Sequence, residues 1–311
     1  MVVKGNNMKL VTYRSGKMVN IGVVMGEDVL DLNAAFKAHL GGSFKGVKVV
    51  ALDMLGLLDM GSKGLVEVKK AAKAAEGSKY LAPLKKVKLM APIPRPRKNI
   101  VCLGLNYAEH VKEGKNAGAT PNLPPVPIYF TKPPTSVSGP YDDIIYPKVT
   151  EKLDYEAELA FVIGKKGKNI PEEKVYDYIM GYMAFDDVSA RDLQSKHQQW
   201  YRGKSLDTFA PMGPWIVTND EVGDPQDLDL WCKVNGAERQ HSNTNDMIFS
   251  IKKIVATLST GITLEVGDIF ATGTPSGVGA AHPLGFLKPG DVVEVGVEKI
   301  GSIKNKVIAE K

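Results

Sequence analysis

Hydrophobic and polar positions in the first ninety residues predict a small unit of short strands and helices. Three apolar runs are separated by turn residues such as Ser15-Gly16-Lys17, a pattern typical of short strands. These strand candidates are Met8–Tyr13, Ile21–Met25 and Val29–Leu32. Residues 33–40 and 65–75 are helix candidates, the second rich in Ala and Lys. This stretch carries no acid/base cluster or metal-ligand spacing, so we expect residues 1–91 to form a small α/β accessory domain.

A proline-rich segment follows and predicts a domain boundary. Pro92, Pro94 and Pro96 occupy alternate positions, which forces an extended backbone and excludes a helix. We therefore expect residues 92–311 to form a second domain, which carries the chemistry.

This second part of the sequence is rich in strand candidates and has few helices. The strand candidates are 100–103, 159–163, 180–185, 215–217, 230–234, 269–271 and 292–297, and the helix candidates are 171–180, 189–199 and 246–259. Strands and helices do not alternate regularly, which argues against a doubly wound parallel sheet. We predict an α+β fold with a mixed sheet rolled on itself.

Composition narrows the class of protein. The chain has 311 residues, 43% of them hydrophobic, and a net charge of +5. The charge excess is small and its basic clusters are short, so we expect no nucleic-acid partner. The two cysteines, Cys102 and Cys232, lie far apart without a metal-ligand spacing, which predicts buried reduced thiols. Without a signal segment or a run of 18 apolar residues, we expect a cytoplasmic protein with no membrane contact.

Acidic residues near two apolar strands predict a metal site. Side chains two apart on a strand point to the same face, so Glu156 and Glu158 are expected side by side. Like charges so close repel each other unless solvent or a cation separates them. The pair Asp186-Asp187 ends another apolar run and offers a third carboxylate. Such a set suits Mg²⁺, with Mn²⁺ and Ca²⁺ as alternatives, better than Zn²⁺.

Further polar residues supply candidate acid/base and binding groups. His110 and Glu113 are three residues apart on a predicted short helix, and a carboxylate orients an imidazole as a general base requires. The stretch Gly114–Pro127 that follows has several Gly and Pro and no apolar period, so we expect this helix to lie on a mobile lid. Arg191 and Gln194 lie one helical turn apart and suit a carboxylate or keto oxygen.

The charge of Lys204 balances the proposed site. Three carboxylates, one dication and this lysine sum to zero charge, as expected of a neutral pocket. The glycine-rich stretch Thr272–Gly279 is compatible either with a plain tight turn or with a backbone that approaches a small ligand.

Several motifs in one order resemble the fumarylacetoacetate hydrolase family. They are Gly104-Leu105-Asn106-Tyr107-Ala108-Glu109-His110, Phe130-Thr131-Lys132-Pro133, Tyr155-Glu156-Ala157-Glu158-Leu159, Asp187-Val188-Ser189-Ala190-Arg191-Asp192, Lys204-Ser205 and Thr272-Gly273-Thr274-Pro275. The resemblance extends from Pro94 to the C-terminus and implies a mixed-sheet β-roll, a homodimer and one divalent cation, commonly Mg²⁺, with no organic cofactor.

The resemblance also implies a role for each candidate residue. The implied ligands are Glu156, Glu158 and Asp187, with Asp187 preferred to Asp186. His110, Glu113 and Lys204 become the catalytic groups, and the residues implied for the substrate pocket are Tyr107, Arg191, Gln194, Gly273 and Thr274.

The implied reaction is metal-dependent cleavage of a C–C bond in a β-dicarbonyl 2-oxo acid, of the acylpyruvate or fumarylpyruvate type. The cation and Lys204 would stabilise an enolate while His110 and Glu113 activate water. Two enzymatic alternatives stay open: an oxaloacetate decarboxylase, and an isomerase or decarboxylase of 2-hydroxymuconate-type intermediates from aromatic degradation. A non-catalytic metal-binding protein is the third alternative, against which the intact pair of His110 and Glu113 argues.

Overall fold

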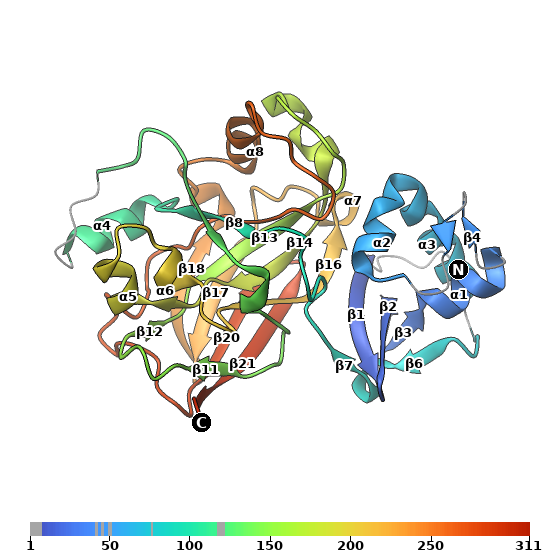
Figure 1. Cartoon of the computed structure of the whole chain (residues 1–311), viewed down its shortest axis with the longest axis horizontal. Coiled ribbons are helices and arrows are strands. Elements are labelled where there is room, and N and C mark those ends of the chain that lie inside the picture. The colour runs from blue at the N-terminus through green and yellow to red at the C-terminus, as the bar shows by residue number, and fades with distance from the viewer. Residues whose placement is uncertain (1–7, 41–42, 45–46, 49–51, 76, 117–121) are drawn as a thin grey trace.

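The structure is a computed structural model that describes residues 8–40, 43–44, 47–48, 52–75, 77–116 and 122–311 (Figure 1). Within these residues it contains a twelve-stranded sheet, a five-stranded sheet and two small ribbons. The larger sheet runs in the order β6 (Leu81–Pro83), β3 (Asp28–Asp31), β2 (Met18–Met25), β1 (Lys9–Ser15), β16 (Ala210–Thr218), β14 (Ile179–Asp186), β13 (Ala157–Ile163), β19 (Ile269–Ala271), β8 (Ile100–Gly104) and β9 (Ile128–Lys132), with β10 (Val137–Ser138) beside β16 and β7 (Lys88–Leu89) beside β1.

The remaining strands form a five-stranded sheet and two two-stranded ribbons. The five-stranded sheet has the order β11 (Ile144–Tyr146), β21 (Gly301–Ala309), β20 (Val292–Val297), β17 (Asp229–Val234) and β18 (Ala237–Asn243), and the ribbons pair β12 (Leu153–Asp154) with β15 (Ser189–Ala190) and β4 (Ser43–Phe44) with β5 (Val47–Lys48). Most neighbouring strands are antiparallel, whereas β8 and β19, β10 and β16, and β11 and β21 are parallel. The prediction of an α+β fold with mixed sheets is confirmed.

Short helices connect and cover the strands. The α-helices are α1 (Leu32–Leu40), α2 (Met54–Asp59), α3 (Gly61–Ala74), α4 (Ala108–Asn116), α5 (Arg191–Lys196), α6 (Tyr201–Lys204), α7 (Asn219–Val222) and α8 (Ile251–Ser259). The 3-10 helices are η1 (Leu84–Lys86), η2 (Pro134–Ser136), η3 (Glu172–Tyr178) and η4 (Thr244–Asp246).

All ten strand candidates coincide with strands, but three helix candidates need correction. In the segment 246–259, helix α8 runs only from Ile251 to Ser259, because Met247 forms a β-bridge with Tyr107 and Ser250 caps the helix. The segment 171–180 forms the 3-10 helix η3 and then enters β14 at Ile179, because Ile179 and Met180 are buried in the sheet. In the segment 189–199, Ser189 and Ala190 first pair with β12, and helix α5 runs only from Arg191 to Lys196.

The first ninety residues continue the large sheet of the remainder. Strand β1 pairs antiparallel with β16, Leu10 lying opposite Ile216. One apolar cluster includes Leu10 and Phe36 together with Ala160 and Met183 from β13 and β14. Ion pairs Lys69–Asp220 and Arg97–Asp59 also join the two parts. The boundary at residues 91/92 stays a prediction, since the two parts share a sheet and a core.

Strands β13 and β14 are buried on both faces, and their alternation decides where polar groups point. In β13, Leu159 and Phe161 contact the cluster shared with the five-stranded sheet, whereas Ala160 and Val162 contact the opposite cluster. Every residue of both strands is buried. A carboxylate placed here is removed from water and must find a partner.

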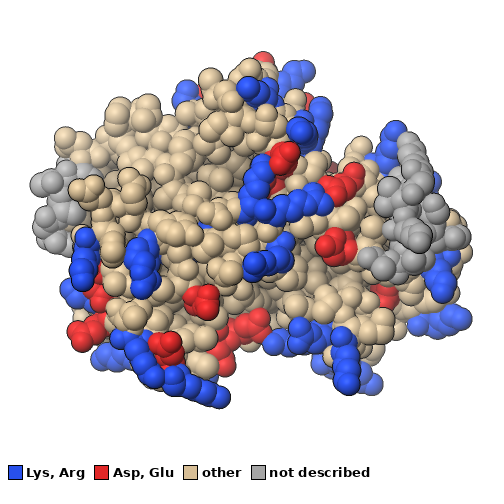
Figure 2. Space-filling model, viewed as in Figure 1, with Lys and Arg blue, Asp and Glu red and all other residues tan. Residues whose placement is uncertain are grey.

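The surface is of mixed charge on the face that Figure 2 shows, where Lys and Arg side chains lie among Asp and Glu side chains. Cys102 and Cys232 are buried free thiols, as predicted. Among the described residues, no helix has both the length and the hydropathy required to cross a bilayer.

Candidate active site

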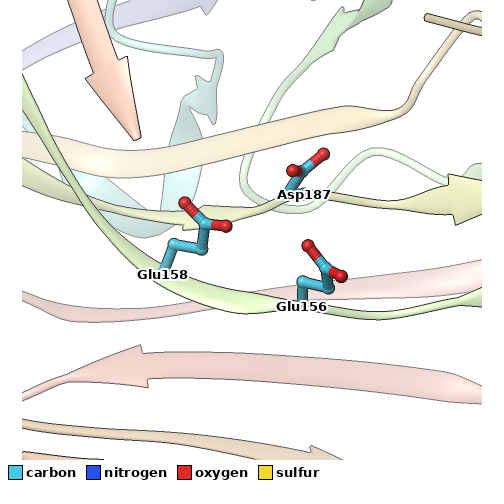
Figure 3. A group of neighbouring side chains, drawn as sticks. All are labelled: Glu156, Glu158 and Asp187. Carbon is cyan, nitrogen blue, oxygen red and sulfur yellow. The ribbon is translucent and has the colours of Figure 1, made fainter. Parts of the chain in front are cut away.

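Three carboxylates converge between the ends of β13 and β14 (Figure 3). Glu156 immediately precedes β13, Glu158 is its second residue, and Asp187 follows β14. Because Glu158 pairs with Phe185, the even-numbered side chains of β13 and the odd-numbered side chains of β14 leave the sheet on the same face. One oxygen from each of the three carboxylates lies within 4.8 Å of the others.

The neighbouring Asp186 lies on the other face. It has the parity of Tyr182 and Ala184, which contact the cluster shared with the five-stranded sheet. Its Oδ1 accepts the Glu156 N–H at 2.9 Å, and Oδ2 has no partner among the described residues. Burial raises the pKa of Asp186 to about 8. Strand alternation thus places Asp187 with the other two carboxylates and Asp186 on the opposite face of the sheet.

Glu158 is the least compensated of the three acids. It is fully buried, its Oε2 accepts the Gly273 N–H at 2.8 Å, and its Oε1 lacks a partner within the described part of the chain. Burial, followed by the charges of Asp187 and Glu156, raises the pKa of Glu158 well above its ordinary value. No Lys or Arg among the described residues forms an ion pair with this carboxyl, and the nearby charge of Lys204 offsets the rise only in part.

Two buried lysines neutralise the other acids. Lys204 Nζ lies 2.7 Å from Glu156 Oε2 and 2.9 Å from Asp187 Oδ2. Lys132 Nζ donates to Asp187 Oδ1 and, at 3.0 Å, to the Val188 carbonyl oxygen. Burial acts to raise the pKa of Glu156, but the charges of Lys204 and Arg191 hold it well below its usual range.

Arg191 links the triad to a fourth carboxylate. Its Nη2 lies 2.6 Å from Glu156 Oε1, its Nε donates to Asp154 Oδ2 at 2.8 Å, and its Nη1 donates to Gln194 Oε1 at 3.1 Å. Asp154 is fully buried and also accepts the N–H groups of Gly279 and Ala280, at 2.6 and 3.0 Å. Arg191 is consequently held in one orientation.

The glycine-rich loop after β19 connects the acidic groups through its backbone. The Gly273 N–H binds Glu158, the Gly277 N–H binds Glu113 Oε1 at 2.8 Å, and the Gly279 N–H binds Asp154. Gly273 has a φ of +91°, a conformation that favours glycine, and a Cβ there would lie 2.8 Å from Asn106 Cβ. The backbone of this loop therefore binds three acidic side chains of the site, and its approach to a small ligand stays a prediction.

His110 and Glu113 lie on α4, with His110 Nδ1 3.2 Å from Glu113 Oε2. Both side chains are largely buried, at 15% and 17% exposure. His110 faces a small cavity of about 50 Å³ that Glu156, Arg191 and Lys204 also line. Residues 117–121 of the expected lid lie outside the described residues.

The predicted substrate residues divide into two groups. Gln194 and Thr274 line the cavity together with Arg191, whereas Tyr107 and Gly273 lie outside its lining. The Tyr107 hydroxyl is buried without a hydrogen-bond partner in the described residues, and burial, with a contribution from Glu158, raises its pKa well above the ordinary value.

Four residues around the site were not predicted from the sequence. Lys132 and Asp154 pair with predicted site residues, Asn106 bridges the backbone at Phe249 and Thr272, and Gln240 donates to Thr274 Oγ1 at 2.8 Å. Lys132 lies in one of the family-like motifs, which was its available signal. Gln240 lies on β18, far from the other motifs, and carries no local signal.

The donor set fits a divalent cation. Three carboxylates, with no Cys or His among them, are hard oxygen ligands of the kind Mg²⁺, Mn²⁺ and Ca²⁺ prefer. The buried Glu158 Oε1, which has no partner among the residues that the structure describes, marks a position where such a charge would satisfy an unpaired acceptor.

Comparison with known proteins identifies the family. The family model described as fumarylacetoacetate (FAA) hydrolase C-terminal matches residues 99–308, about two thirds of the chain. The chain belongs to the fumarylacetoacetate hydrolase family. It is an enzyme of that family, and the resemblance stated from the motifs is confirmed.

Relatives in this family carry several activity names. Oxaloacetate tautomerase YisK from Bacillus subtilis (strain 168) is 39% identical over 309 residues, covering 96% of this chain and 100% of that protein. Mitochondrial oxaloacetate tautomerase fahd2 from Xenopus laevis is 40% identical, covering 97% and 91%. The structure of maleylpyruvate hydrolase from Sphingobium sp. SYK-6 in complex with manganese(II) ion and pyruvate matches with a TM-score of 0.75 at 30% identity, covering 98% of this chain and 100% of that one.

Proposed function

We propose that this enzyme interconverts the keto and enol forms of oxaloacetate, a four-carbon 2-oxo dicarboxylic acid. The observation that carries the proposal is that a histidine, a carboxylate of the triad, an arginine and a lysine all line one small cavity, and that Glu113 contacts this histidine from behind. The relatives named oxaloacetate tautomerase, which match almost the whole chain, support this substrate.

Arg191 and Lys204 would bind the acidic substrate. Arg191 is held by Asp154, Glu156 and Gln194, and the guanidinium has five N–H donors, so donors remain for a substrate carboxylate. Lys204 is buried against Phe130, with Nζ 5.2 Å from the ring centroid. A fixed positive charge in a dry site acts strongly on an oxygen that becomes negative during reaction.

Glu156, Glu158 and Asp187 would hold one divalent cation. When bound, the cation supplies positive charge that polarises the keto group of the substrate. The Gly273 N–H keeps the Glu158 carboxylate in place, and the Asp187 N–H donates to the Glu156 backbone carbonyl oxygen at 2.9 Å, so the backbone that carries the other two carboxylates is also fixed.

His110 would move the proton. Because Glu113 contacts Nδ1, Nε2 is the ring nitrogen left to exchange a proton with the substrate. In the keto-to-enol direction Nε2 takes a proton from C3, the C–H electron pair becomes the C2=C3 double bond, and the π pair of the C2 carbonyl moves to its oxygen. The imidazolium then gives the same proton to that oxygen, so His110 is neutral again when the enol leaves. The reverse reaction returns a proton to C3. No water is consumed and no C–C bond breaks.

Hydrolysis of an acylpyruvate, which the sequence analysis placed first, is the second candidate. The same His110–Glu113 pair suits activation of a water, and the similar structure named maleylpyruvate hydrolase favours this alternative. Decarboxylation of oxaloacetate and the isomerase alternative use the same binding groups.

A substrate panel separates these reactions. Purified enzyme, stripped with EDTA and given Mg²⁺ or Mn²⁺, is assayed with oxaloacetate, acetylpyruvate and fumarylpyruvate while enol absorbance and pyruvate release are both followed. The proposal predicts rapid loss of enol oxaloacetate with little pyruvate. Faster pyruvate release from an acylpyruvate than tautomerisation of oxaloacetate would replace it with the hydrolase.

A further inference from the structure

Trp200 forms one wall of the cavity. The preceding residues 195–199 are exposed, whereas Trp200 is half-buried and lines the cavity. Its ring meets Phe130 edge to face, with centroids 5.5 Å apart and planes at 77°. Phe130 in turn lies against Lys204, so the tryptophan is packed directly beside the charged part of the site.

Gly104 provides the space in which this ring lies. A Cβ at Gly104 would lie 2.0 Å from Trp200 Cζ3 and 2.6 Å from Cη2, closer than real side chains approach. Gly104 ends strand β8, pairs with Ile128, and is not among the glycines with positive φ. Its backbone would accept another residue, so the requirement for glycine comes from the tryptophan ring.

The charged and the apolar residues that line the cavity differ in how freely they could change. Glu156, Arg191 and Lys204 are fixed by buried ion pairs. The apolar lining residues are Leu103, Leu105, Phe130 and Trp200. Phe130 lies in β9 within the large sheet, while Trp200 belongs to the short connection between α5 and α6.

We propose that Trp200 limits the length of the 2-oxo acid that the cavity accepts, and that Gly104 seats its ring. This inference rests on the proposed function. The enzyme accepts the four-carbon oxaloacetate, and the indole ring excludes acylpyruvates with a longer chain beyond C4. Removing the ring enlarges the cavity and leaves its charged lining residues in place.

The test compares kcat/KM for fumarylpyruvate with kcat/KM for oxaloacetate in Trp200→Ala, Trp200→Phe and Gly104→Ala. Trp200→Ala is expected to raise the ratio at least tenfold, and Trp200→Phe by less. Gly104→Ala displaces the ring and shifts the ratio in the same direction. The double variant Gly104→Ala/Trp200→Ala should match Trp200→Ala, since the methyl group then meets no ring. The exposed neighbour Tyr201 lies outside the cavity lining, and Tyr201→Ala should leave the ratio unchanged.

A ratio within twofold of wild type in a folded Trp200→Ala enzyme would overturn the inference. If Trp200→Ala does not fold, Trp200→Phe and Gly104→Ala still carry the test. An additive double variant would overturn the role assigned to Gly104.

Ligand binding separates this inference from the proposed function. Oxalate and fumarylpyruvate are titrated in the presence of Mn²⁺ by calorimetry, and tryptophan fluorescence is followed in wild type and Trp200→Phe. Wild type should bind oxalate with a fluorescence change that Trp200→Phe loses. Trp200→Ala, whose cavity is enlarged, should bind fumarylpyruvate tightly, whereas wild type should not. Length-selective binding without oxaloacetate turnover would support the role of Trp200 and contradict the proposed function. Oxaloacetate turnover with equal binding of short and long ligands would support the proposed function and contradict the role of Trp200.

Discussion

Replacing Glu158 by glutamine tests the electrostatics of the triad. Among the described residues, Glu158 has no ion-pair partner, whereas Glu156 and Asp187 both pair with Lys204. Glutamine keeps the size of the side chain and an oxygen that accepts the Gly273 N–H. The substitution therefore removes the charge with little change in shape.

The magnitude follows from the spacing of the charges. At the 4.8 Å limit within the triad, two like charges repel by about 3.5 kcal/mol at an effective dielectric constant of about 20. Uptake of a proton by Glu158 relieves part of this repulsion, as its raised pKa indicates. Metal-free Glu158→Gln should therefore unfold with a free energy equal to that of wild type or up to a few kcal/mol higher.

The same change should remove the stabilisation by metal. Wild type at a Mn²⁺ concentration 100 times its Kd gains about 2.7 kcal/mol of unfolding free energy, because the ion binds only the folded state. Glu158→Gln should lose most of this gain at the same concentration, since a neutral amide replaces a charged ligand.

Urea unfolding followed by circular dichroism, in EDTA and in Mn²⁺, measures both effects. Asp186→Asn is the matched control. It removes a buried carboxyl next to Asp187 in sequence but on the opposite face of the sheet from the triad, so it should keep the Mn²⁺ gain. A Glu158→Gln variant that is less stable than wild type in EDTA, or that keeps the full Mn²⁺ gain, would refute the reasoning.

Three further predictions concern single residues. His110→Ala should lower kcat by roughly 10²- to 10⁴-fold in steady-state assays while keeping the Mn²⁺ stabilisation, as expected of a proton carrier, and a near-normal kcat would remove it from that role. Asp154→Asn should raise KM for oxaloacetate roughly tenfold with a smaller change in kcat, because Arg191 loses a charged partner. A roughly tenfold fall in kcat with an unchanged KM would contradict a role in positioning Arg191. The raised pKa of Asp186 means that the folded protein holds the proton of this carboxyl more tightly than the unfolded protein does. The free energy of unfolding of wild type should therefore fall as pH rises from about 4 to about 8, and the contribution of this group to that fall is absent in Asp186→Asn. Urea unfolding in EDTA at pH 5 and pH 8 should show the difference between Asp186→Asn and wild type moving in favour of the variant at pH 8, and parallel profiles would exclude this contribution.

The sequence predicted those parts of the structure that depend on local pattern. Alternation along a strand was enough to place Glu156 and Glu158 together, and three-residue spacing on a helix was enough for His110 and Glu113. Strand alternation could not choose between Asp186 and Asp187, because the choice depends on how β14 pairs with β13. The family resemblance implied Asp187, and that side chain lies beside those of Glu156 and Glu158. Its role as a metal ligand stays a prediction.

Residues held by distant contacts escaped prediction. Lys132 meets Asp187 across 55 positions of the chain, and Gln240 meets the Ala157 N–H across 83. Strand β21 was missed because a polar residue, Asn305, interrupts its apolar alternation. That side chain is nevertheless buried, where it donates to the carbonyl oxygens of Gly139 and Asp142.

We propose that proton transfer by His110 on a short 2-oxo acid depends on a cation held by the triad. The most direct measurement is the rate of enol oxaloacetate loss, corrected for the uncatalysed reaction, in EDTA-stripped wild type before and after Mn²⁺ is restored, with His110→Ala alongside. We expect little activity without Mn²⁺, full recovery with it, and almost none for His110→Ala under either condition. Equal rates with and without the cation, or a His110→Ala enzyme as fast as wild type, would contradict this proposal.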